Sequence, residues 1–473
     1  MLPLALILKA KGARVSGSDR ALDQGRLQKK FAFLRSQGIQ LFPQDGSGVT
    51  SNSIVVASGA VEANVPDIAA AQAKSVHIMS RAELLAELFN DSGVRIGIAG
   101  TSGKSTVTGM IGHILTKAGK DPTIMNGAVM NNLTSDDAPF ASARIGKADI
   151  FVSEVDESDG SITRYTPSIA VVNNVAFDHK SLEELRNLFG GFATKADMAI
   201  LNLDNLETAK LVSSLPPERT IAYSLKKRSA DLLATAIVPA PEGISFCARY
   251  RDRASEGISL LVPGRHNVTN ALAAIGAGIA AGVPLGTSAR ALADFKGISR
   301  RLETLGKAGD VTIIDDFAHN PDKIAATLSA LHDFDGRLLI FFQPHGFGPL
   351  RLMKDEFIRG FVKHLAPNDV LVMPEPVYFG GTTDRSVSSI DIVTSVVAAG
   401  RRAESFVTRE ECGQRLIELA EPGDRIVVMG ARDDTLSEFA QHLLMSLKSK
   451  PGSKYSRGGH EEVALITTVS KLE

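Results

Sequence analysis

Short apolar runs that end in polar residues alternate with segments of helical periodicity along most of the chain. Near the start, apolar residues over 1–12 predict a buried helix that ends at Gly12. Residues 13–19 and 53–60 then predict two short strands, and residues 81–89 (RAELLAELF) predict an amphipathic helix. This alternation is typical of an α/β fold with mostly parallel sheets.

The same alternation continues in two further blocks. The second block contains predicted strands at 94–100, 149–160 and 168–179 and predicted helices at 105–119 and 267–282. The third block contains predicted strands at 311–321, 337–346, 369–376 and 424–434, with helices between them. We therefore expect three domains, at 1–91, 92–297 and 298–448. The Gly-, Ser- and Lys-rich end, 449–473, is expected to be disordered.

Composition narrows the classes of protein that the chain can belong to. The chain has 473 residues and a net charge of −1, so its overall charge does not indicate nucleic-acid binding. Its only cysteines, Cys247 and Cys412, exclude a disulfide scaffold and favour a cytoplasmic protein. No apolar run approaches the roughly 20 residues that a membrane-spanning helix needs. The start lacks a charged leader and a small-residue cleavage site, so we expect no signal peptide.

A glycine-rich loop at 97–105 (GIAGTSGKS) joins a predicted strand to a predicted helix. Backbone N–H groups in such a loop bind phosphate, a lysine adds a positive charge, and a hydroxyl can bind Mg²⁺. The first glycine stands one residue further from the lysine than in the common phosphate-loop pattern. The loop alone fits hydrolysis, phosphoryl transfer or activation of a carboxylate. The residues expected to bind nucleotide here are Gly100, Thr101, Ser102, Gly103, Lys104, Ser105 and Thr106.

Acidic residues and a histidine follow the next strands. Glu154 ends the predicted strand at 149–154, where a nucleotide-bound Mg²⁺ needs an oxygen ligand. Asp156, Glu157 and Asp159 are weaker candidates, because acidic turns of this kind are often only solvated loops. His179 ends the following strand and is equally compatible with a structural and a ligand role, since Mg²⁺ prefers oxygen ligands.

Six motifs in a fixed order resemble the Mur ligases. They are GxxGTxGK[ST] at 97–105, ExDESD at 154–159, NxxxDH at 174–179, GRHNVxNALAA at 264–274, RRxE at 300–303 and DDFAHNP at 315–321. The resemblance extends from Met1 to about Leu447 and is strongest to the members that join UDP-N-acetylmuramate to L-alanine. It implies a Rossmann-like substrate domain, a central P-loop ATPase domain and a Rossmann-like C-terminal domain. It also implies ATP-dependent amide formation through an acyl phosphate, in peptidoglycan synthesis.

The resemblance also implies roles for individual residues. Lys104 and Ser105 would contact phosphates and Mg²⁺, while Glu154 and His179 would each hold one of two Mg²⁺ ions. Asn267 and Asn270 would approach the adenine, although Asn267 also suits a helix cap. Further residues are implied in nucleotide, catalytic or substrate contacts, namely Arg301, Asp316, His319, Asp19, Ser158, His345 and Arg351. Taken singly, Arg301 also fits a surface ion pair. The expected partners are small molecules, with no nucleic acid or membrane insertion, and the expected state is a monomer or weak dimer.

The chain departs from the family pattern at its start. It begins where the family's first strand and its GxGGxGM loop would end. We expect a gap in the first sheet and a weakened pyrophosphate site, and we expect the natural start to lie upstream or the sequence to be shortened.

Three other departures lie later in the chain, and the last of them concerns the acceptor amine. Ser102 replaces a usual histidine, the segment after His179 is shorter, and Gly346 and Pro349 stand where arginines are usual. Phe317 suits a related recycling ligase that adds a tripeptide. Two further alternatives are a P-loop kinase or NTPase switch and a degenerate nucleotide-binding homologue without turnover.

Overall fold

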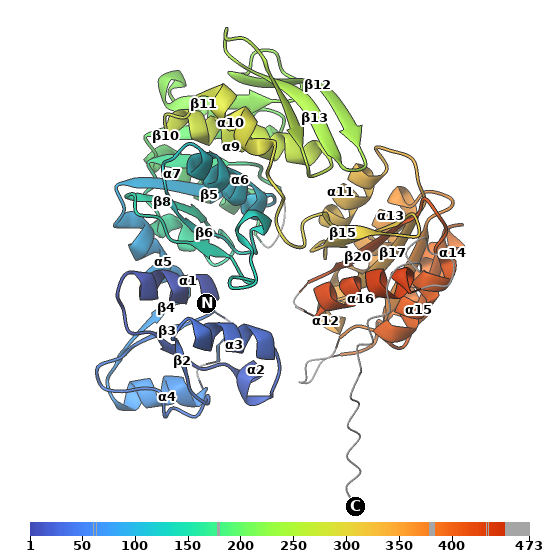
Figure 1. Cartoon of the computed structure of the whole chain (residues 1–473), viewed down its shortest axis with the longest axis horizontal. Helices are drawn as coiled ribbons and strands as arrows, with labels where there is room; N and C mark the ends of the chain where they lie inside the picture. Colours follow the sequence, from blue (N-terminus) through green and yellow to red (C-terminus); the bar gives the residue numbers. More distant parts are fainter. Residues whose placement is uncertain are drawn as a thin grey trace, which may run out of the picture. The chain divides into compact units, whose positions relative to one another are not determined.

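The computed structural model describes residues 1–59, 61–62, 64–176, 180–377, 384–431, 433 and 435–449. It divides into two compact units, Met1–Glu303 with Ala330–Phe334, and Thr304–Ser329 with Asp335–Glu473. Both units consist of α-helices and mostly parallel sheets, which confirms the predicted α/β class (Figure 1). The predicted disorder of the tail concerns residues that, after Ser449, lie outside the described part of the chain.

The N-terminal segment contains two separate two-stranded parallel sheets, β1–β2 and β3–β4. Its elements are α1 (Leu2–Ala10), β1 (Ser16–Gly17), α2 (Arg20–Asp23), α3 (Gln28–Ser36), β2 (Gln40–Leu41), β3 (Ile54–Ala57), α4 (Pro66–Ala73), β4 (His77–Ser80) and α5 (Arg81–Asn90). Within the described residues, no strand joins the two pairs. Leu4 and Ile7 of α1 are buried in the same core as Phe89 of α5.

The rest of the first unit is built on a ten-stranded sheet with the order β14-β13-β12-β11-β10-β9-β5-β8-β6-β7. Its strands are β5 (Val94–Ala99), β6 (Thr123–Met125), β7 (Ala143–Arg144), β8 (Ile150–Glu154), β9 (Ile169–Val172), β10 (Met198–Asn202), β11 (Thr220–Ser224), β12 (Leu232–Ala240), β13 (Gly243–Tyr250) and β14 (Glu256–Leu260). The neighbours from β12 to β6 are parallel, whereas β13, β14 and β7 pair antiparallel.

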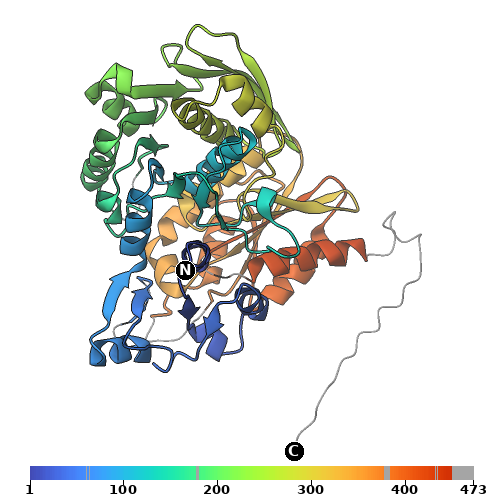
Figure 2. The ribbon, with the colours of Figure 1, turned by 60° about the vertical axis from the view of Figure 1, so that its left-hand side comes forward.

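Helices cover both faces of this sheet, because its central strands are apolar on both sides. The helices are α6 (Lys104–Lys117), α7 (Leu182–Lys195), α8 (Leu206–Ser214), α9 (Arg265–Ala280) and α10 (Leu285–Leu292), with short 3-10 helices at Asn131–Leu133, Ser161–Arg164 and Pro217–Arg219. Ile98, Val152 and Val171 join the core under α6, α9 and α10, while Phe151 and Val172 join the core under α5 and α7. Helices α6 and α9 lie side by side in both ribbon views (Figures 1 and 2).

The second unit contains a six-stranded sheet with the order β15-β16-β20-β17-β18-β19. Its strands are β15 (Glu303–Ala308), β16 (Val311–Asp316), β17 (Leu338–Gln343), β18 (Val370–Pro374), β19 (Arg402–Phe406) and β20 (Arg425–Gly430). Its helices are α11 (Pro321–Leu331), α12 (Phe347–Leu352), α13 (Lys354–His364), α14 (Ser389–Ala398), α15 (Arg409–Leu419) and α16 (Leu436–Lys448). The pairs from β16 to β19 are all parallel, so the carboxyl ends of β16 and β17 lie at one edge.

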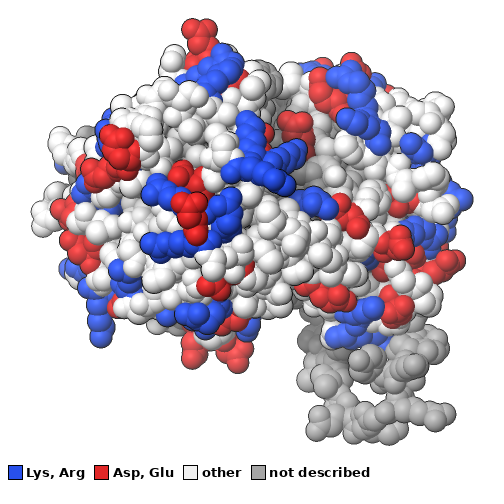
Figure 3. Space-filling view, turned by 90° about the horizontal axis from the view of Figure 1, so that it is seen from above, with Lys and Arg blue, Asp and Glu red and all other residues white. Residues whose placement is uncertain are grey.

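Acidic and basic side chains share the surface. On the face that Figure 3 shows, Lys and Arg lie among Asp and Glu, and neither sign covers the face. Within the described residues, every helix is too short or too polar to span a bilayer.

Candidate active site

The glycine-rich loop leaves β5 at Ala99 and enters α6 at Lys104. Gly103 starts the helix with φ +84°, a conformation that side chains rarely adopt. A Cβ at Gly103 would also lie 2.6 Å from both Asn173 Nδ2 and Asn270 Oδ1. Because Gly103 offers no side-chain cap, the first N–H groups of α6 remain available to an anion.

Side chains and backbone after β9 hold the loop in place. The Thr101 hydroxyl donates to the Ala176 carbonyl at 3.1 Å and accepts from the Ala176 N–H at 3.0 Å. Asn174 accepts from the Ser102 N–H at 2.9 Å and donates to the Ser102 carbonyl at 3.0 Å. The loop is therefore shaped by an adjacent segment of the same sheet.

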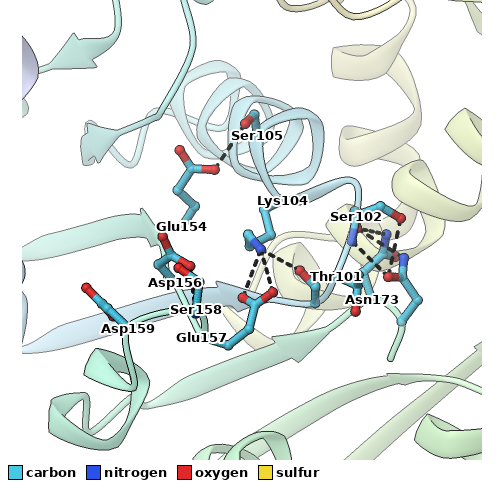
Figure 4. A network of polar contacts seen from close by, with 12 residues as sticks. Thr101, Ser102, Lys104, Ser105, Glu154, Asp156, Glu157, Ser158, Asp159 and Asn173 are labelled. Carbon is cyan, nitrogen blue, oxygen red and sulfur yellow. Dashed lines mark hydrogen bonds and ion pairs between the residues drawn. The ribbon is translucent and has the colours of Figure 1, made fainter. Parts of the chain in front are cut away.

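Lys104 points towards a buried carboxylate (Figure 4). Its Nζ donates to Glu157 Oε2 at 2.8 Å, to Glu157 Oε1 at 3.1 Å and to the Gly100 carbonyl at 2.7 Å. Glu157 is only 6% exposed, so this ion pair is shielded from water. The charge of Lys104 is therefore paired inside the protein.

Ser105 and Glu154 form the second polar contact of the loop helix (Figure 4). The Ser105 hydroxyl donates to Glu154 Oε2 at 3.0 Å. Burial raises the pKa of Glu154, while the charges of Lys104 and Arg301 and the hydrogen bond from Ser105 oppose that rise. Gly127 lies against the carboxylate, and a Cβ there would be 2.0 Å from Glu154 Oε1.

Ser105 and Glu154 together suit Mg²⁺, because both present the hard oxygen donors that this ion prefers. The third expected ligand, His179, lies outside the described residues. Among the described residues, no three His, Cys, Asp or Glu side chains gather as a metal-binding group. Asp156 and Asp159 accept backbone N–H bonds from Ser158 and Ser161, each at 2.9 Å, and so shape their own turn.

The structure places the remaining expected residues of the first unit as follows. Thr106 is buried in the first turn of α6. Arg301 is half-buried and donates to the Arg300 carbonyl at 3.0 Å. Ser158 is exposed in the acidic turn. Asp19 caps α2 by accepting from the Ala21 N–H at 2.8 Å, and is thus positioned by its own helix.

Asn267 and Asn270 lie in the first turns of α9, where both are 4% exposed. Asn270 Nδ2 donates to Asn267 Oδ1 at 3.1 Å, and Asn270 Oδ1 accepts from Asn173 Nδ2 at 2.9 Å. Asn267 Nδ2 donates to the carbonyl of Pro263 at 2.7 Å. The two expected adenine contacts therefore belong to a buried amide network that reaches the phosphate loop.

In the second unit, polar residues gather where β16 and β17 end. Asp316 accepts from the Thr327 hydroxyl at 2.5 Å. The rings of His319 and His345 meet edge to face with centroids 5.4 Å apart, which brings these two expected residues together. Arg351 is exposed and pairs with Asp384.

Sequence reasoning missed several residues that shape the site. Asn126 donates to the Ser105 carbonyl at 2.9 Å, and Gly127 makes room for Glu154. Asn173 and Tyr223 complete the amide network, with Tyr223 donating to Asn173 Oδ1 at 2.6 Å. A polar pair directly after the apolar run 169–172 is the only sequence signal for Asn173, and Tyr223 has none.

Three family models match the chain. Residues 1–92 match the model described as Mur ligase family, catalytic domain, and residues 98–278 match the Mur ligase middle domain. Residues 300–432 match the model described as Mur ligase, glutamate ligase domain.

Curated relatives extend over nearly the whole chain. The UDP-N-acetylmuramate–L-alanine ligase of Novosphingobium aromaticivorans is 34% identical over 92% of this chain and 92% of its own length. The enzyme of the same name from Sorangium cellulosum is 34% identical over 95% of each chain. The alanine ligase of Geobacter sulfurreducens is 33% identical over 91% of this chain and 92% of its own length.

Solved structures share the fold. The UDP-N-acetylmuramate–alanine ligase of Thermotoga maritima aligns with a TM-score of 0.76, at 23% identity over 95% of this chain and 96% of that one. A murein peptide ligase of Psychrobacter arcticus aligns with a TM-score of 0.65, at 24% identity over 95% and 97% of the two chains. With relatives above 30% identity over almost its full length and three matching family models, this chain belongs to the Mur ligase family.

Proposed function

We propose that this chain is an ATP-dependent ligase that joins the carboxylate of UDP-N-acetylmuramate to the amino group of L-alanine in peptidoglycan synthesis. The proposal is carried by the placement of Lys104, Ser105 and Glu154 around one loop, in a chain of this family. The curated relatives carry the name of that activity, which supports both substrates.

The chemistry explains why a phosphate loop serves amide formation. A carboxylate acylates amines poorly at neutral pH because its leaving group would be an oxide. A carboxylate oxygen therefore attacks the γ-phosphorus of ATP, and the bond to ADP breaks. The amine then attacks the carbonyl carbon of this acyl phosphate, a C–N bond forms, inorganic phosphate leaves, and the amine loses a proton. One ATP is consumed for each amide formed.

The chain's own residues orient the substrates and balance their charges during these two reaction steps. The N–H groups at the start of α6 bind phosphate oxygens, and Lys104 offsets the repulsion between triphosphate and carboxylate. Mg²⁺ held by Ser105 and Glu154 would add further neutralisation of the phosphate oxygens. The family resemblance implies a second Mg²⁺ ion at His179.

The second unit supplies the acceptor side in this proposal. His319, His345 and Arg351 would face the amine and carboxylate of the amino acid, and Arg301 and Asp316 would contact the nucleotide. Arginine suits carboxylate recognition because its planar guanidinium can donate two parallel hydrogen bonds.

Phosphate release tests the proposal directly. The purified chain is mixed with Mg-ATP and UDP-N-acetylmuramate, and L-alanine, L-serine, glycine and the tripeptide are added one at a time. Release is expected only when the sugar nucleotide and L-alanine are both present. If, of the four amines, only the tripeptide supports phosphate release in the presence of UDP-N-acetylmuramate, the recycling reaction is assigned instead. Phosphate release without any amine would indicate a simple NTPase.

A pair of lysine variants on α6 provides the control. Lys104→Met should lower the rate at least about a hundredfold, because it removes a charge that faces the transferred phosphoryl group. Lys117→Met alters the last turn of the same helix, where Lys117 pairs with Asp294, and should leave the rate near that of the parent. Equal losses in the two variants would show that the helix, and not the loop charge, is responsible.

A further inference from the structure

The RRxE motif contains a glutamate that the proposed mechanism leaves without a role. Glu303 is the last residue of the first unit before Thr304, where the chain enters the second unit. It closes a turn at residues 298–303 that carries Arg301, an expected nucleotide contact. This segment, 298–303, is the RRxE turn.

The carboxylate of Glu303 joins two parts of the first unit. Its Oε2 accepts from the Arg300 N–H at 2.8 Å, and its Oε1 accepts from Asn131 Nδ2 at 2.9 Å. The Ser299 hydroxyl donates to Asn131 Oδ1 at 3.0 Å, with Glu303 Oε1 3.4 Å away. Because a carboxylate can only accept, Asn131 must present its amide nitrogen to Glu303.

The backbone on both sides of Arg301 has an unfavourable conformation. Arg300 has φ +60° and Leu302 has φ +48°. Left-handed backbone is unfavourable for residues with side chains, and it persists only where the surrounding structure holds it. The Arg300 N–H donates to Glu303, and the Arg300 carbonyl accepts from Arg301 Nη1 at 3.0 Å. The carboxylate therefore holds the residue whose carbonyl holds the guanidinium.

Backbone hydrogen bonds anchor only the first half of the RRxE turn. The Ser299 N–H donates to the Val129 carbonyl at 2.9 Å, and the Arg301 N–H donates to the Ile298 carbonyl at 3.1 Å. Neither bond involves the Arg300 carbonyl, which binds the guanidinium. Support for the second half of the turn therefore comes from the carboxylate.

The charge of Arg301 acts on the candidate metal ligand. Burial raises the pKa of Glu154, and the positive charge of Arg301 is one of the contributions that oppose this rise. Glu154 accepts from Ser105 of the loop helix. A shift of the guanidinium would therefore change the electrostatic field where Mg²⁺ and the phosphates are expected.

We propose that Glu303 and Asn131 are positioning residues that hold Arg301 in place for the nucleotide phosphates. The inference rests on the proposed function, in which Arg301 contacts the nucleotide. Asn131 fixes the carboxylate, the carboxylate fixes Arg300, and the Arg300 carbonyl holds the guanidinium. A guanidinium that is held in advance loses less freedom on binding, so it binds phosphate more tightly.

The first test is Asn131→Asp, which keeps the size of the side chain and removes its donor. The new carboxylate faces that of Glu303, so acceptor meets acceptor and the two negative charges repel each other. Calorimetry measures the dissociation constant of Mg-ATP with the full chain, without sugar nucleotide or amine. We expect this constant to rise about tenfold, the lower end of the range for loss of a supporting hydrogen bond around a functional group.

An exchange variant shows whether the contact itself is responsible. Asn131→Asp combined with Glu303→Gln moves the donor from one side chain to the other and keeps the charge of the pair. The new amide can donate to the new carboxylate and still accept from the Arg300 N–H. We expect the exchange variant to bind Mg-ATP as the parent does. If it binds as weakly as Asn131→Asp alone, the inference is overturned.

A third comparison asks whether the pair acts through Arg301. Arg301→Met alone should weaken Mg-ATP binding, and adding Asn131→Asp should then weaken it no further. A further loss of the same size would show that the pair only supports the fold, and would overturn the inference. Parent affinity in Arg301→Met would overturn it as well.

Asn132→Asp provides the matched control. Asn132 is the neighbour of Asn131 in the same 3-10 helix. Its Oδ1 accepts from the Lys296 N–H at 2.7 Å, and its Nδ2 donates to the Asp294 carbonyl at 2.8 Å, so its contacts precede the RRxE turn. This variant should keep the parent affinity. Equal losses in Asn131→Asp and Asn132→Asp would show that docking of the helix is responsible, and would overturn the inference.

Binding and phosphate release together separate this inference from the proposed function. A parent chain that binds Mg-ATP but releases no phosphate with any amine contradicts the ligase, while the affinities of the variants still decide on the inference. A parent chain that does not bind Mg-ATP contradicts both.

Discussion

At the scale of single residues, the site depends on close approaches that leave no room for a methyl group. The carboxylate of Glu154 occupies the space beside Gly127, with its Oε1 only 2.0 Å from where a Cβ would stand. The same carboxylate accepts from Ser105, which begins the loop helix with Lys104. The position of the expected metal ligand is therefore set by a residue that has no side chain.

Gly127→Ala should displace Glu154 from Ser105 and weaken the response to Mg²⁺. We expect the Mg²⁺ concentration for half-maximal phosphate release to rise about tenfold, the size of effect typical of a disturbed metal-ligand environment. The control is Gly191→Ala in α7, where a Cβ would meet nothing within 4 Å. A Mg²⁺ dependence equal to that of the parent would show that Glu154 has another role.

The residues closest to the phosphate loop were predictable because their types and spacing reflect chemistry. Lys104, Ser105 and Glu154 come together as the motifs implied. Asn173 and Tyr223 were not predictable, because their buried hydrogen bond joins a tyrosine hydroxyl to an asparagine oxygen 50 residues apart in the chain and follows no periodicity. The pairing of Lys104 with Glu157 also required coordinates, since Asp156, Glu157 and Asp159 could not be told apart in the sequence.

At the scale of elements, helices α7 and α8 are joined by an ion pair on their shared side of the central sheet. Arg186 of α7 donates to Glu207 of α8 at 2.9 Å through Nη2, and Lys210 adds a contact at 3.0 Å. The hydrogen bonds from Arg186 and then Lys210 lower the pKa of Glu207 from 4.5 to about 2. The folded state therefore holds this carboxylate ionised more strongly than the unfolded state does.

The pH dependence of Arg186→Met should follow from this shift. A lowered pKa stabilises the fold above the ordinary value near 4.5, and that stabilisation is lost as pH falls towards 2. We expect a lower thermal midpoint than the parent at pH 7 and a difference that shrinks steadily below pH 4.5. Circular dichroism melts at several pH values measure it, with the exposed Arg228→Met as control. If the thermal midpoints of variant and parent differ by the same amount at every pH, the ion pair with Glu207 does not cause the pH dependence.

Most of the strands that the sequence predicted are buried on both faces, although the buried strands β10 and β11 were missed. The apolar runs at β5, β8, β9, β16, β17, β18 and β20 all became parallel strands. The antiparallel extension of β12, β13 and β14 was missed, because these strands mix buried positions with partly or fully exposed ones. Strand β12 also contains Pro239, and its register with β13 shifts between Thr235 and Val238. Edge strand β19 lacks fully buried positions and was missed for the same reason.

At the scale of the whole molecule, the chain is two units that each carry part of the expected machinery. Lys104, Glu154 and the buried amide network of Asn267 and Asn270 belong to the first unit, whereas Asp316 and His319 belong to the second. The family resemblance implies nucleotide contacts for Asp316 as well as for Lys104, so we predict that substrate binding protects segments of both units.

Hydrogen exchange measured by mass spectrometry tests whether substrates protect both units. With Mg-ATP and UDP-N-acetylmuramate but no amine, we expect slower exchange around 100–106 and also around 315–320. With ADP alone, the slowing should be confined mainly to the first segment, because no γ-phosphate is present. If exchange in the second unit never slows, under any combination of substrates, the roles proposed for Asp316 and His319 are contradicted.

The buried pair of Lys104 and Glu157 has a consequence for turnover. A small anion that enters the resting loop must break this pair and has only one phosphate group with which to replace it. ATP brings three phosphates and a base, so it can make the exchange favourable. Inorganic phosphate, in contrast, meets a lysine whose charge is already paired with Glu157. We therefore expect the ligase without bound ATP to be inhibited only weakly by its product, inorganic phosphate.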